Sequence, residues 1–444
     1  MNTKKRLYSQ TNFNHDEPKC KKMNKSKEKV VQVCGGHGHI LILTQMGKVY
    51  SIGRNDHGQL GSGDNINKLF PFLINSIYFN NEKIVQVCCA CNYSMALSQN
   101  GHVYSWGYGF NGRLGHGDES NKNVAHKIND NFFNKESIKL ISMGLFFSFA
   151  LTKTNKLYAW GENCDGQLSL GNDIDQFKPM LVDSNTYNNE CIIKIACGHH
   201  HTLLLTKKQN SNSLTNIYAC GSNYSGQLGL GITHDINLFQ PIDSNYFEKQ
   251  KIKDIKSGGH FSFALVETNN SNETKIYSWG HVGIGRMELG DSNNKNRPFQ
   301  MDSSLFSGKV IQISNGSLHL FAITKQQGSN EKKVFTWGGN ENGQLGLGHF
   351  NNHFKPIEIN MNCFKKEQII SIDGNNSSWG NSFAVTKTGK LFVCGHNRHR
   401  ELGFGHRKNI NVPQLFCPDL FGNENKNSKI YNNQSFEDIV IEYD

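Results

Sequence analysis

Cysteine and histidine are the residues whose spacing in this chain could support chemistry. Residues 88–91 read Cys-Cys-Ala-Cys and contain a C-x-x-C pair, and His199, His200 and His201 are adjacent. A structural zinc site needs four converging ligands, and no second C-x-x-C pair is present. Adjacent residues on an extended segment point to alternate faces, so the histidines are not expected to converge. We therefore expect no metal and no other cofactor, and interpret these cysteines as small buried residues.

The chain shows no signature of a catalytic site. It lacks a P-loop, a G-x-S-x-G elbow, an H-E-x-x-H motif and a dinucleotide-binding fingerprint. Its scattered carboxylates form no recognisable acid–base pair. We therefore expect no catalytic residues, although a protein that mechanically displaces a partner's ligand would leave no such signature.

The composition also predicts a compartment. The first 29 residues lack the apolar core of a secretory signal peptide, and no window of about 18 apolar residues could span a membrane. Twelve cysteines in 444 residues are too dilute for a disulfide scaffold and are expected to be reduced thiols. We expect a monomer in the cytoplasm or the nucleus, without membrane contact.

Internal repetition determines the architecture. A glycine that closes a strand-like V-Y or L-Y segment recurs seven times, at intervals of 54 to 60 residues. Seven copies indicate one supersecondary unit repeated seven times rather than several unrelated domains. The seven glycines, which we interpret as structural, are Gly53, Gly107, Gly161, Gly221, Gly280, Gly338 and Gly395.

Every unit has the same internal order. A β-branched strand such as VVQV is followed by a small-residue turn, an apolar strand such as ILILT, a hairpin and a third strand such as KVYSIG. A Gly-punctuated loop such as GQLGLG then leads towards the next unit. Three or four short antiparallel strands per unit, repeated radially, predict an all-β, seven-bladed β-propeller.

We predict three regions along the chain. They are a disordered basic arm over residues 1–29, a propeller over 30–422, and a tail over 423–444. The repeats are predicted to start near residues 30, 84, 138, 192, 252, 310 and 369. Residues 436–443 resemble the opening strand of an eighth unit, and we predict that they pair at the seam and help to close the ring. A frayed tail is the alternative.

One aromatic position recurs just before the strand-ending glycine. Equivalent positions in the other units hold Ile52, Cys220 and Cys394, which indicates that the position is filled for volume. We interpret the tryptophans as packing residues that face the core. They are Trp106, Trp160, Trp279 and Trp337.

The repeats resemble those of the regulator of chromosome condensation family. The resemblance rests on the G-x-x-H turn at residues 36–39, 198–201 and 316–319, on the V-Y-S-W-G strand end and on the G-Q-L-G-x-G loop. It covers roughly residues 30–420 and implies a seven-bladed propeller. The founding member is a chromatin-bound guanine nucleotide exchange factor for the small GTPase Ran, whereas most relatives are interaction modules. Plant photoreceptor relatives use clustered tryptophans, so light sensing is not expected from one tryptophan per blade.

The resemblance also implies partner-binding candidates. The exchange factor uses a β-wedge inserted after the strand-ending glycine of an early blade, whereas residues 107–112 and 161–166 run straight into their loops. The family's GTPase-facing loops supply Asp and His contacts, for which Asp56, His201 and His319 are the nearest matches. Histidines at such turns more often cap backbone groups, and we favour this structural role over a partner contact.

Irregular loops add two further partner-binding candidates. Glu288 replaces the middle glycine of the loop in unit 5, and Arg400 replaces the first glycine in unit 7. These departures mark either a partner site or simple drift. The hairpins between the second and third strands are also longer in units 4, 5 and 6, which indicates either a binding face or neutral expansion of Asn- and Ser-rich loops.

The net charge of +10 is concentrated in the arm. Residues 1–29 hold nine basic and three acidic residues, a net +6, and the other 415 residues hold the remaining +4. The arm therefore offers a nuclear signal, a non-specific nucleic-acid or chromatin contact, or a solvated linker. We favour a scaffold that acts through protein partners; the alternative is an exchange factor for a Ran-like GTPase held on chromatin by the arm. The arm candidates are Lys4, Lys5, Arg6, Lys19, Lys21 and Lys22.

Overall fold

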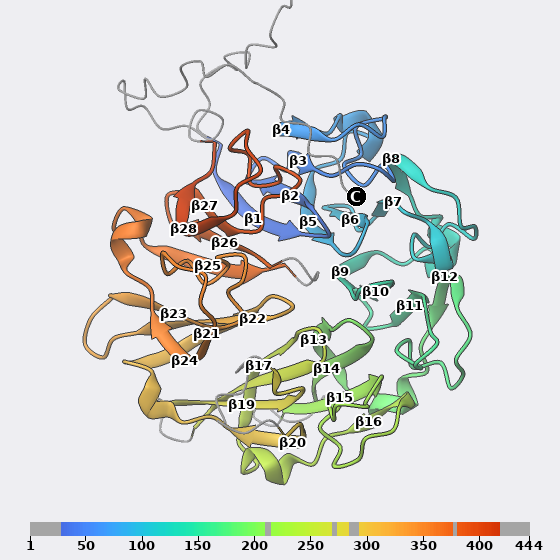
Figure 1. Ribbon diagram of the computed structural model, residues 1–444. Helices are drawn as coiled ribbons and strands as arrows, with labels where there is room; N and C mark the ends of the chain where they lie inside the picture. Colours follow the sequence, from blue (N-terminus) through green and yellow to red (C-terminus); the bar gives the residue numbers. More distant parts are fainter. Residues whose placement is uncertain (1–27, 209–214, 269–272, 284–292, 376–379, 418–444) are drawn as a thin grey trace, which may run out of the picture.

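The chain forms a ring of seven four-stranded antiparallel sheets (Figure 1). The computed structural model describes residues 28–208, 215–268, 273–283, 293–375 and 380–417. Within each sheet the strands follow one another in sequence order, so every blade takes all four strands from one repeat. The seven-bladed propeller predicted from the repeats is confirmed. The predicted strand at 436–443 and the arm at 1–27 lie outside the described residues.

The first four blades begin near the N-terminus and continue around the ring. Blade 1 contains β1 (Val30–Gly35), β2 (His39–Thr44), β3 (Val49–Gly53) and β4 (Lys68–Leu73). Blade 2 contains β5 (Ile84–Cys89), β6 (Tyr93–Ser98), β7 (Val103–Gly107) and β8 (Lys122–Lys127). Blade 3 contains β9 (Ile138–Met143), β10 (Phe147–Thr152), β11 (Leu157–Gly161) and β12 (Gln176–Leu181). Blade 4 contains β13 (Cys191–Cys197), β14 (His201–Lys207), β15 (Thr215–Gly221) and β16 (Ile236–Pro241).

The last three blades complete the ring. Blade 5 contains β17 (Lys251–Ser257), β18 (Phe261–Glu267), β19 (Thr274–Gly280) and β20 (Lys295–Gln300). Blade 6 contains β21 (Lys309–Asn315), β22 (His319–Lys325), β23 (Lys332–Gly338) and β24 (His353–Glu358). Blade 7 contains β25 (Ile369–Gly374), β26 (Asn381–Thr386), β27 (Leu391–Gly395) and β28 (Ile410–Leu415).

Short 3-10 helices make the steps between blades. Each begins after an Asn or Asp whose side chain accepts a hydrogen bond from the backbone two residues later, as Asn75 does from Ile77 at 3.1 Å. The helices between blades are η1 (Ser76–Phe79), η3 (Asp130–Phe133), η4 (Ser184–Tyr187), η5 (Ser244–Phe247), η7 (Ser303–Leu305) and η8 (Met361–Phe364). A seventh 3-10 helix, η2 (Phe110–Gly112), belongs to a loop of blade 2.

The hydrophobic core lies between blades rather than within them. The buried apolar residues form seven clusters among the described residues, and each cluster joins one pair of neighbouring blades. The cluster at the seam joins Val30 and Ile42 of blade 1 to Phe383 and Leu391 of blade 7. The Val30 amide also donates to the Gly389 carbonyl at 3.1 Å. Side-chain packing therefore closes the ring at the seam.

The propeller has two faces of different construction. We call the loop face the one that carries the turns between first and second strands and the connections between third and fourth strands. We call the hairpin face the opposite one, with the turns between second and third strands. On the loop face, all seven connections from third to fourth strand span 14 residues. On the hairpin face, the turns span four residues in blades 1, 2, 3 and 7, but six or seven in blades 4 to 6.

Candidate protein-binding surface

Two of the repeated tryptophans, Trp106 and Trp160, each fasten their blade to the loop of the blade before it. Trp106 and Trp160 are fully buried. The Trp106 indole Nε1 donates to the Gln59 carbonyl at 2.9 Å, and the Trp160 Nε1 donates to the Arg113 carbonyl at 3.0 Å. The equivalent tryptophans of blades 5 and 6 are also buried, and are Trp279 and Trp337. These residues position the loops of the loop face rather than contact solvent.

The strand-ending glycines let the backbone turn sharply at the end of each third strand, because they adopt a positive φ. Gly107 has a φ of 104°, and a Cβ there would lie 2.5 Å from the carbonyl oxygen of Asn92. Only glycine adopts such a backbone without strain. The φ values run from 101° to 110° at all seven positions, which are Gly53, Gly107, Gly161, Gly221, Gly280, Gly338 and Gly395.

His201 and His319 lie inside the propeller and link neighbouring blades. His201 Nε2 lies 3.0 Å from the Ser262 hydroxyl, and His319 Nε2 lies 2.9 Å from the Ser382 hydroxyl. Neither histidine has exposed surface, so a direct contact of these side chains with a partner, one of the two roles considered above, is not supported. Burial lowers the pKa of His319 to about 3 and lowers that of His201 well below its usual range, so both imidazoles are neutral.

Buried asparagines hold the loops of the loop face. In blade 4 the Asn223 amide Nδ2 donates to the carbonyls of Ile232 and His234 at 3.0 and 3.1 Å, and its Oδ1 accepts from the Leu228 N–H at 3.0 Å. The equivalent residue in five blades is a fully buried asparagine. These residues, which we call the asparagine clamps, are Asn55, Asn163, Asn223, Asn340 and Asn397.

The sequence pattern did not identify the asparagine clamps, because the glycines are the most obvious repeated residues of the same loop. Their signal is an asparagine two residues after the strand-ending glycine, which is present in five of the seven units. Gly109 and Val282 occupy this position in blades 2 and 5. Since a clamp satisfies several loop backbone groups at once, it favours a fixed length in the five connections that contain one.

A chain of aromatic rings begins in blades 1 to 3 of the loop face. The Tyr108 ring lies 4.4 Å from His57 and 6.0 Å from Phe110, centroid to centroid. The Arg113 guanidinium lies 5.0 Å from the Tyr108 centroid and 4.5 Å from that of Phe146. We call this chain and its continuation the aromatic arc, which comprises His57, Tyr108, Phe110, Arg113, Phe146, His199, His200, Tyr224 and His260.

The aromatic arc continues into blades 4 and 5. The ring of Phe146 lies 5.8 Å from that of His200, and His199 lies 5.2 Å from His260. The Tyr224 hydroxyl is 2.8 Å from His260 Nδ1. The arc thus crosses four blade interfaces, and it brings together residues that lie far apart in the sequence.

The aromatic arc combines exposed rings with charged groups. Phe110 and Tyr224 are 51% and 60% exposed. Near the middle of the arc, His200 Nδ1 lies 3.2 Å from the Glu162 carboxylate and 3.4 Å from that of Asp165. Burial raises the pKa of the Asp165 carboxyl above its usual value. Arginine and aromatic side chains such as tyrosine supply much of the binding energy of protein interfaces. This surface therefore suits recognition of a protein.

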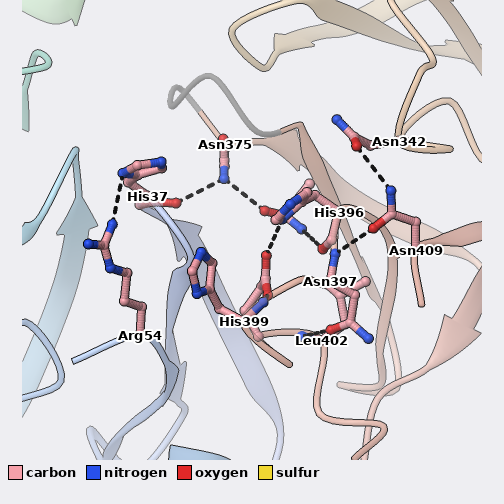
Figure 2. Close-up of polar contacts among 12 residues, drawn as sticks. His37, Arg54, Asn342, Asn375, His396, Asn397, His399, Leu402 and Asn409 are labelled. Atoms are coloured by element: carbon pink, nitrogen blue, oxygen red, sulfur yellow. Dashed lines mark hydrogen bonds and ion pairs between the residues drawn. The ribbon is translucent and has the colours of Figure 1, made fainter. Parts of the chain in front are cut away.

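The seam between blades 7 and 1 is a second polar cluster on the loop face (Figure 2). The buried His396 Nδ1 lies 2.7 Å from the Glu401 carboxylate, which also accepts from the His399 N–H at 2.9 Å. Across the seam, Arg54 lies 3.5 Å from His37 Nδ1. Burial and the nearby Arg54 charge lower the pKa of His37 to about 4.

Two of the partner-binding candidates predicted from the sequence lie beside the seam between blades 7 and 1. Asp56 is exposed and pairs with Arg54 at 2.6 Å, beside the seam. Arg400 lies across the seam in blade 7 and adopts a φ of 60°, at a position where most other units have glycine. The structure therefore places Asp56 and Arg400 on the two sides of one seam. Glu288 and the arm residues lie outside the described residues.

The hairpin face carries a cavity between blades 5 and 6. Its volume is about 810 Å³, and residues 326–330 of the blade 6 hairpin line it. The four lysines that line it are Lys253, Lys275, Lys309 and Lys325, and its apolar wall includes Ile276, Met301 and Phe306. The cavity therefore presents positive charge around an apolar wall.

No group of three or more His, Cys, Asp or Glu among the described residues is arranged to hold a metal ion. No helix there is long and apolar enough to cross a membrane.

Comparison with family models identifies the repeat. The model of the RCC1-like domain matches residues 2–322, and the model of the regulator of chromosome condensation (RCC1) repeat matches residues 332–372. The chain belongs to the RCC1-like family. The family resemblance predicted from the glycine and histidine motifs is thereby confirmed.

Sequence relatives within this family are diverse. The chain is 32% identical to the ultraviolet-B receptor UVR8 of Arabidopsis thaliana over 72% of this chain and 67% of the receptor. It is 31% identical to the E3 ubiquitin-protein ligase HERC2 of Homo sapiens over 87% of this chain but only 8% of the ligase. The family thus supports a propeller with an interaction or regulatory role.

Solved structures share the fold at lower identity. Human WBSCR16 matches with a TM-score of 0.70 and 20% identity, over 83% of this chain and 93% of that chain. Yeast RCC1 (Prp20), in a structure bound to Kap60, matches with a TM-score of 0.67 and 18% identity over 91% of both chains.

Proposed function

We propose that this RCC1-like propeller is a protein-interaction module that binds a regulatory partner through the aromatic arc. The observation that carries the proposal is the arc itself, in which the exposed rings of Phe110 and Tyr224, half-buried rings and an ionic cluster run across five blades. The buried Arg113 guanidinium packs against the rings in its middle. The asparagine clamps Asn55 and Asn223 fix the loops that carry His57 and Tyr224. A surface held in one shape loses little conformational entropy on binding, which favours affinity.

The test compares two exposed aromatic positions on different parts of the ring. A Phe110→Ala, Tyr224→Ala double variant removes the exposed rings of the arc. The matched control is Phe354→Ala, which removes a ring that is 60% exposed on the outer strand β24 of blade 6. Each purified full-length protein is used to capture partners from lysate of the source cells, with quantitative mass spectrometry as the readout.

The proposal expects a specific pattern of loss. Partners captured by the unchanged protein should fall about 10-fold or more with the double variant, since buried interface aromatics each contribute on the order of 1–2 kcal/mol. The control should capture them at the original level. Equal capture by all three proteins would overturn the proposed use of the arc.

A guanine nucleotide exchange factor is the second candidate. Prp20p of Saccharomyces cerevisiae, which shares this fold, has been described with its binding to Gsp1p and histones, and the basic arm here would suit a chromatin contact. Against it stand the seven connections of equal length, since a wedge inserted after a third strand would lengthen one of them. A nucleotide-release assay with purified Ran and related GTPases tests it directly. Release at the intrinsic rate would exclude the candidate for the GTPases assayed.

The hairpin face offers a separate test of where partners bind. Shortening the hairpins of blades 4, 5 and 6 to four residues, as in blade 1, changes the length of this face and, in blade 6, removes residues that line the lysine-lined cavity. Under the proposal, partners that need the arc are still captured by this variant. Loss of those partners with intact folding would instead assign binding to the hairpin face.

A further inference from the structure

Two cysteines from neighbouring blades meet near the propeller axis. Cys34 lies in β1 and Cys89 in β5, the innermost strands of blades 1 and 2 (Figure 1). Their Sγ atoms are 2.9 Å apart, and both residues are partly exposed. A disulfide bond needs about 2.05 Å, so only a small movement separates the two thiols from a bond.

The repeat explains why these two positions are in contact, but it does not explain why both of them carry a thiol. At the equivalent place between blades 3 and 4, the Ser142 hydroxyl lies 3.3 Å from the Cys197 Sγ. The same inner-strand packing thus brings these two positions together in more than one pair of blades. Between blades 1 and 2, both positions carry a thiol.

The two thiols are electrostatically unequal. Burial alone would raise the pKa of Cys89, but the contact with the Cys34 thiol and the nearby His39 imidazole outweigh it and lower that pKa below its usual value. Burial and the Cys89 contact raise the pKa of Cys34. The imidazole of His39 is itself held by the Ser94 hydroxyl at 3.1 Å. Cys89 is therefore the nucleophile of the pair, and Cys34 is the thiol that can react with its oxidised form.

Neighbouring cysteines lack this activation. Burial raises the pKa of Cys88, whose Sγ lies 3.7 Å from the Ile141 carbonyl oxygen. Burial likewise raises the pKa of Cys91. Since the thiolate is the reactive form, oxidation should select Cys89 over both.

We propose that Cys34 and Cys89 are an oxidation site that closes to a disulfide when a peroxide reaches it. The Cys89 thiolate attacks one peroxide oxygen, the O–O bond breaks, and a sulfenic acid and one water form after proton transfer. The Cys34 sulfur then attacks the sulfenic sulfur, loses its proton and releases a second water. Two thiols and one hydrogen peroxide thus give one disulfide and two waters, and the bond joins blade 1 to blade 2.

The experiment uses the reduced full-length protein and limiting hydrogen peroxide. After quenching with an alkylating agent, non-reducing peptide mass spectrometry should show a Cys34–Cys89 crosslink with a loss of about 2 Da, reversed by a dithiol. Cys89→Ser should abolish the fast reaction. Cys34→Ser should leave a sulfenic acid on Cys89 that dimedone labels. Cys88→Ser should leave the crosslink unchanged, and circular dichroism checks the fold of each variant.

A second variant separates activation from proximity. Ser142→Cys places a new thiol beside Cys197, whose pKa burial raises to about 12. This pair should oxidise at least about 10-fold more slowly than Cys34 and Cys89. Equal rates would overturn the assignment of Cys89 as an activated thiol. Absence of the Cys34–Cys89 crosslink in the folded protein, or its formation no faster than modification of Cys88 and Cys91, would overturn the site.

Discussion

The two faces of the propeller differ in how much their connections vary. Loop-face connections between third and fourth strands all span 14 residues, whereas hairpin-face turns span four to seven. Hydrogen bonding contributes to the difference, since asparagine clamps satisfy buried backbone groups in five of the seven loop-face connections. Exposed hairpins such as that of blade 1, where Met46 is 65% exposed, have no such constraint. The connections of the loop face therefore differ from blade to blade in their side chains but not in their length, whereas those of the hairpin face differ in length.

Loss of one asparagine clamp should give the largest effect on stability. Asn223→Ala leaves the Leu228 N–H and two loop carbonyls without their partner, so we expect a loss of about 3 kcal/mol in the free energy of unfolding. Denaturant titration measures it. The control, Asn330→Ala in an exposed turn of the hairpin face, should stay within about 0.5 kcal/mol of the original protein. Similar losses at both sites would remove the distinction between the faces.

Acid sensitivity should come from the histidines beneath the loop face. His319 has a pKa of about 3 in the folded state against 6.5 when exposed, so below pH 6.5 protons bind the unfolded chain preferentially. Its contribution is complete above pH 6.5 and declines as the pH falls towards 3. We expect the original protein to lose about 2 kcal/mol more than His319→Phe between pH 7.5 and pH 5.

Phenylalanine is a suitable replacement because Phe147 and Phe261 occupy the same position in blades 3 and 5. The Ser382 hydroxyl keeps its hydrogen bond to the Gln344 carbonyl at 2.7 Å. Denaturant titrations at each pH measure the free energy of unfolding. His234→Phe at an exposed site gives the reference slope of that free energy against pH. Parallel slopes for His319→Phe and the original protein would contradict the prediction.

The smallest effect is expected from lengthening a hairpin. Inserting Gly-Ser after Met46 in the four-residue turn of blade 1 should cost less than about 1 kcal/mol, since loop-closure entropy rises slowly with length. The same insertion after Asp64, within the connection held by Asn55, should cost at least about 2 kcal/mol because it displaces clamp partners. Thermal unfolding of both variants tests the contrast, and equal shifts would disprove it.

Periodicity alone was enough to predict the fold. The glycine spacing and the strand order within each unit lead to seven blades, because each repeat can bury its apolar face only against the next repeat. The histidines at residues 201 and 319 were matched to partner-binding loops, whereas the structure buries them against serines of the following blade. Their serine partners lie 61 and 63 residues away, so only the packed ring reveals the role.

The candidate surfaces were harder to predict because they combine residues from different repeats. His57 and His260 belong to blades 1 and 5, and no local pattern connects them. Asp56 and Arg400 were selected one at a time, and only ring closure places them beside the same seam. The 54-residue repeat aligns Cys88 with Cys34, yet the thiol that meets Cys34 is Cys89, since neighbouring blades are offset by one position at this contact.

Closure of the ring by side-chain packing has a consequence for how this fold can evolve and be permuted. Because each blade takes its four strands from one repeat, the unit that evolution can duplicate, delete or exchange is a whole blade. β1 contacts β25 and β26 at the seam, so the first and last blades are already neighbours. A short linker from residue 417 to residue 28, with new ends opened at any of the 3-10 helices between blades, would give a permuted chain of the same architecture. The start of the propeller is in that sense arbitrary.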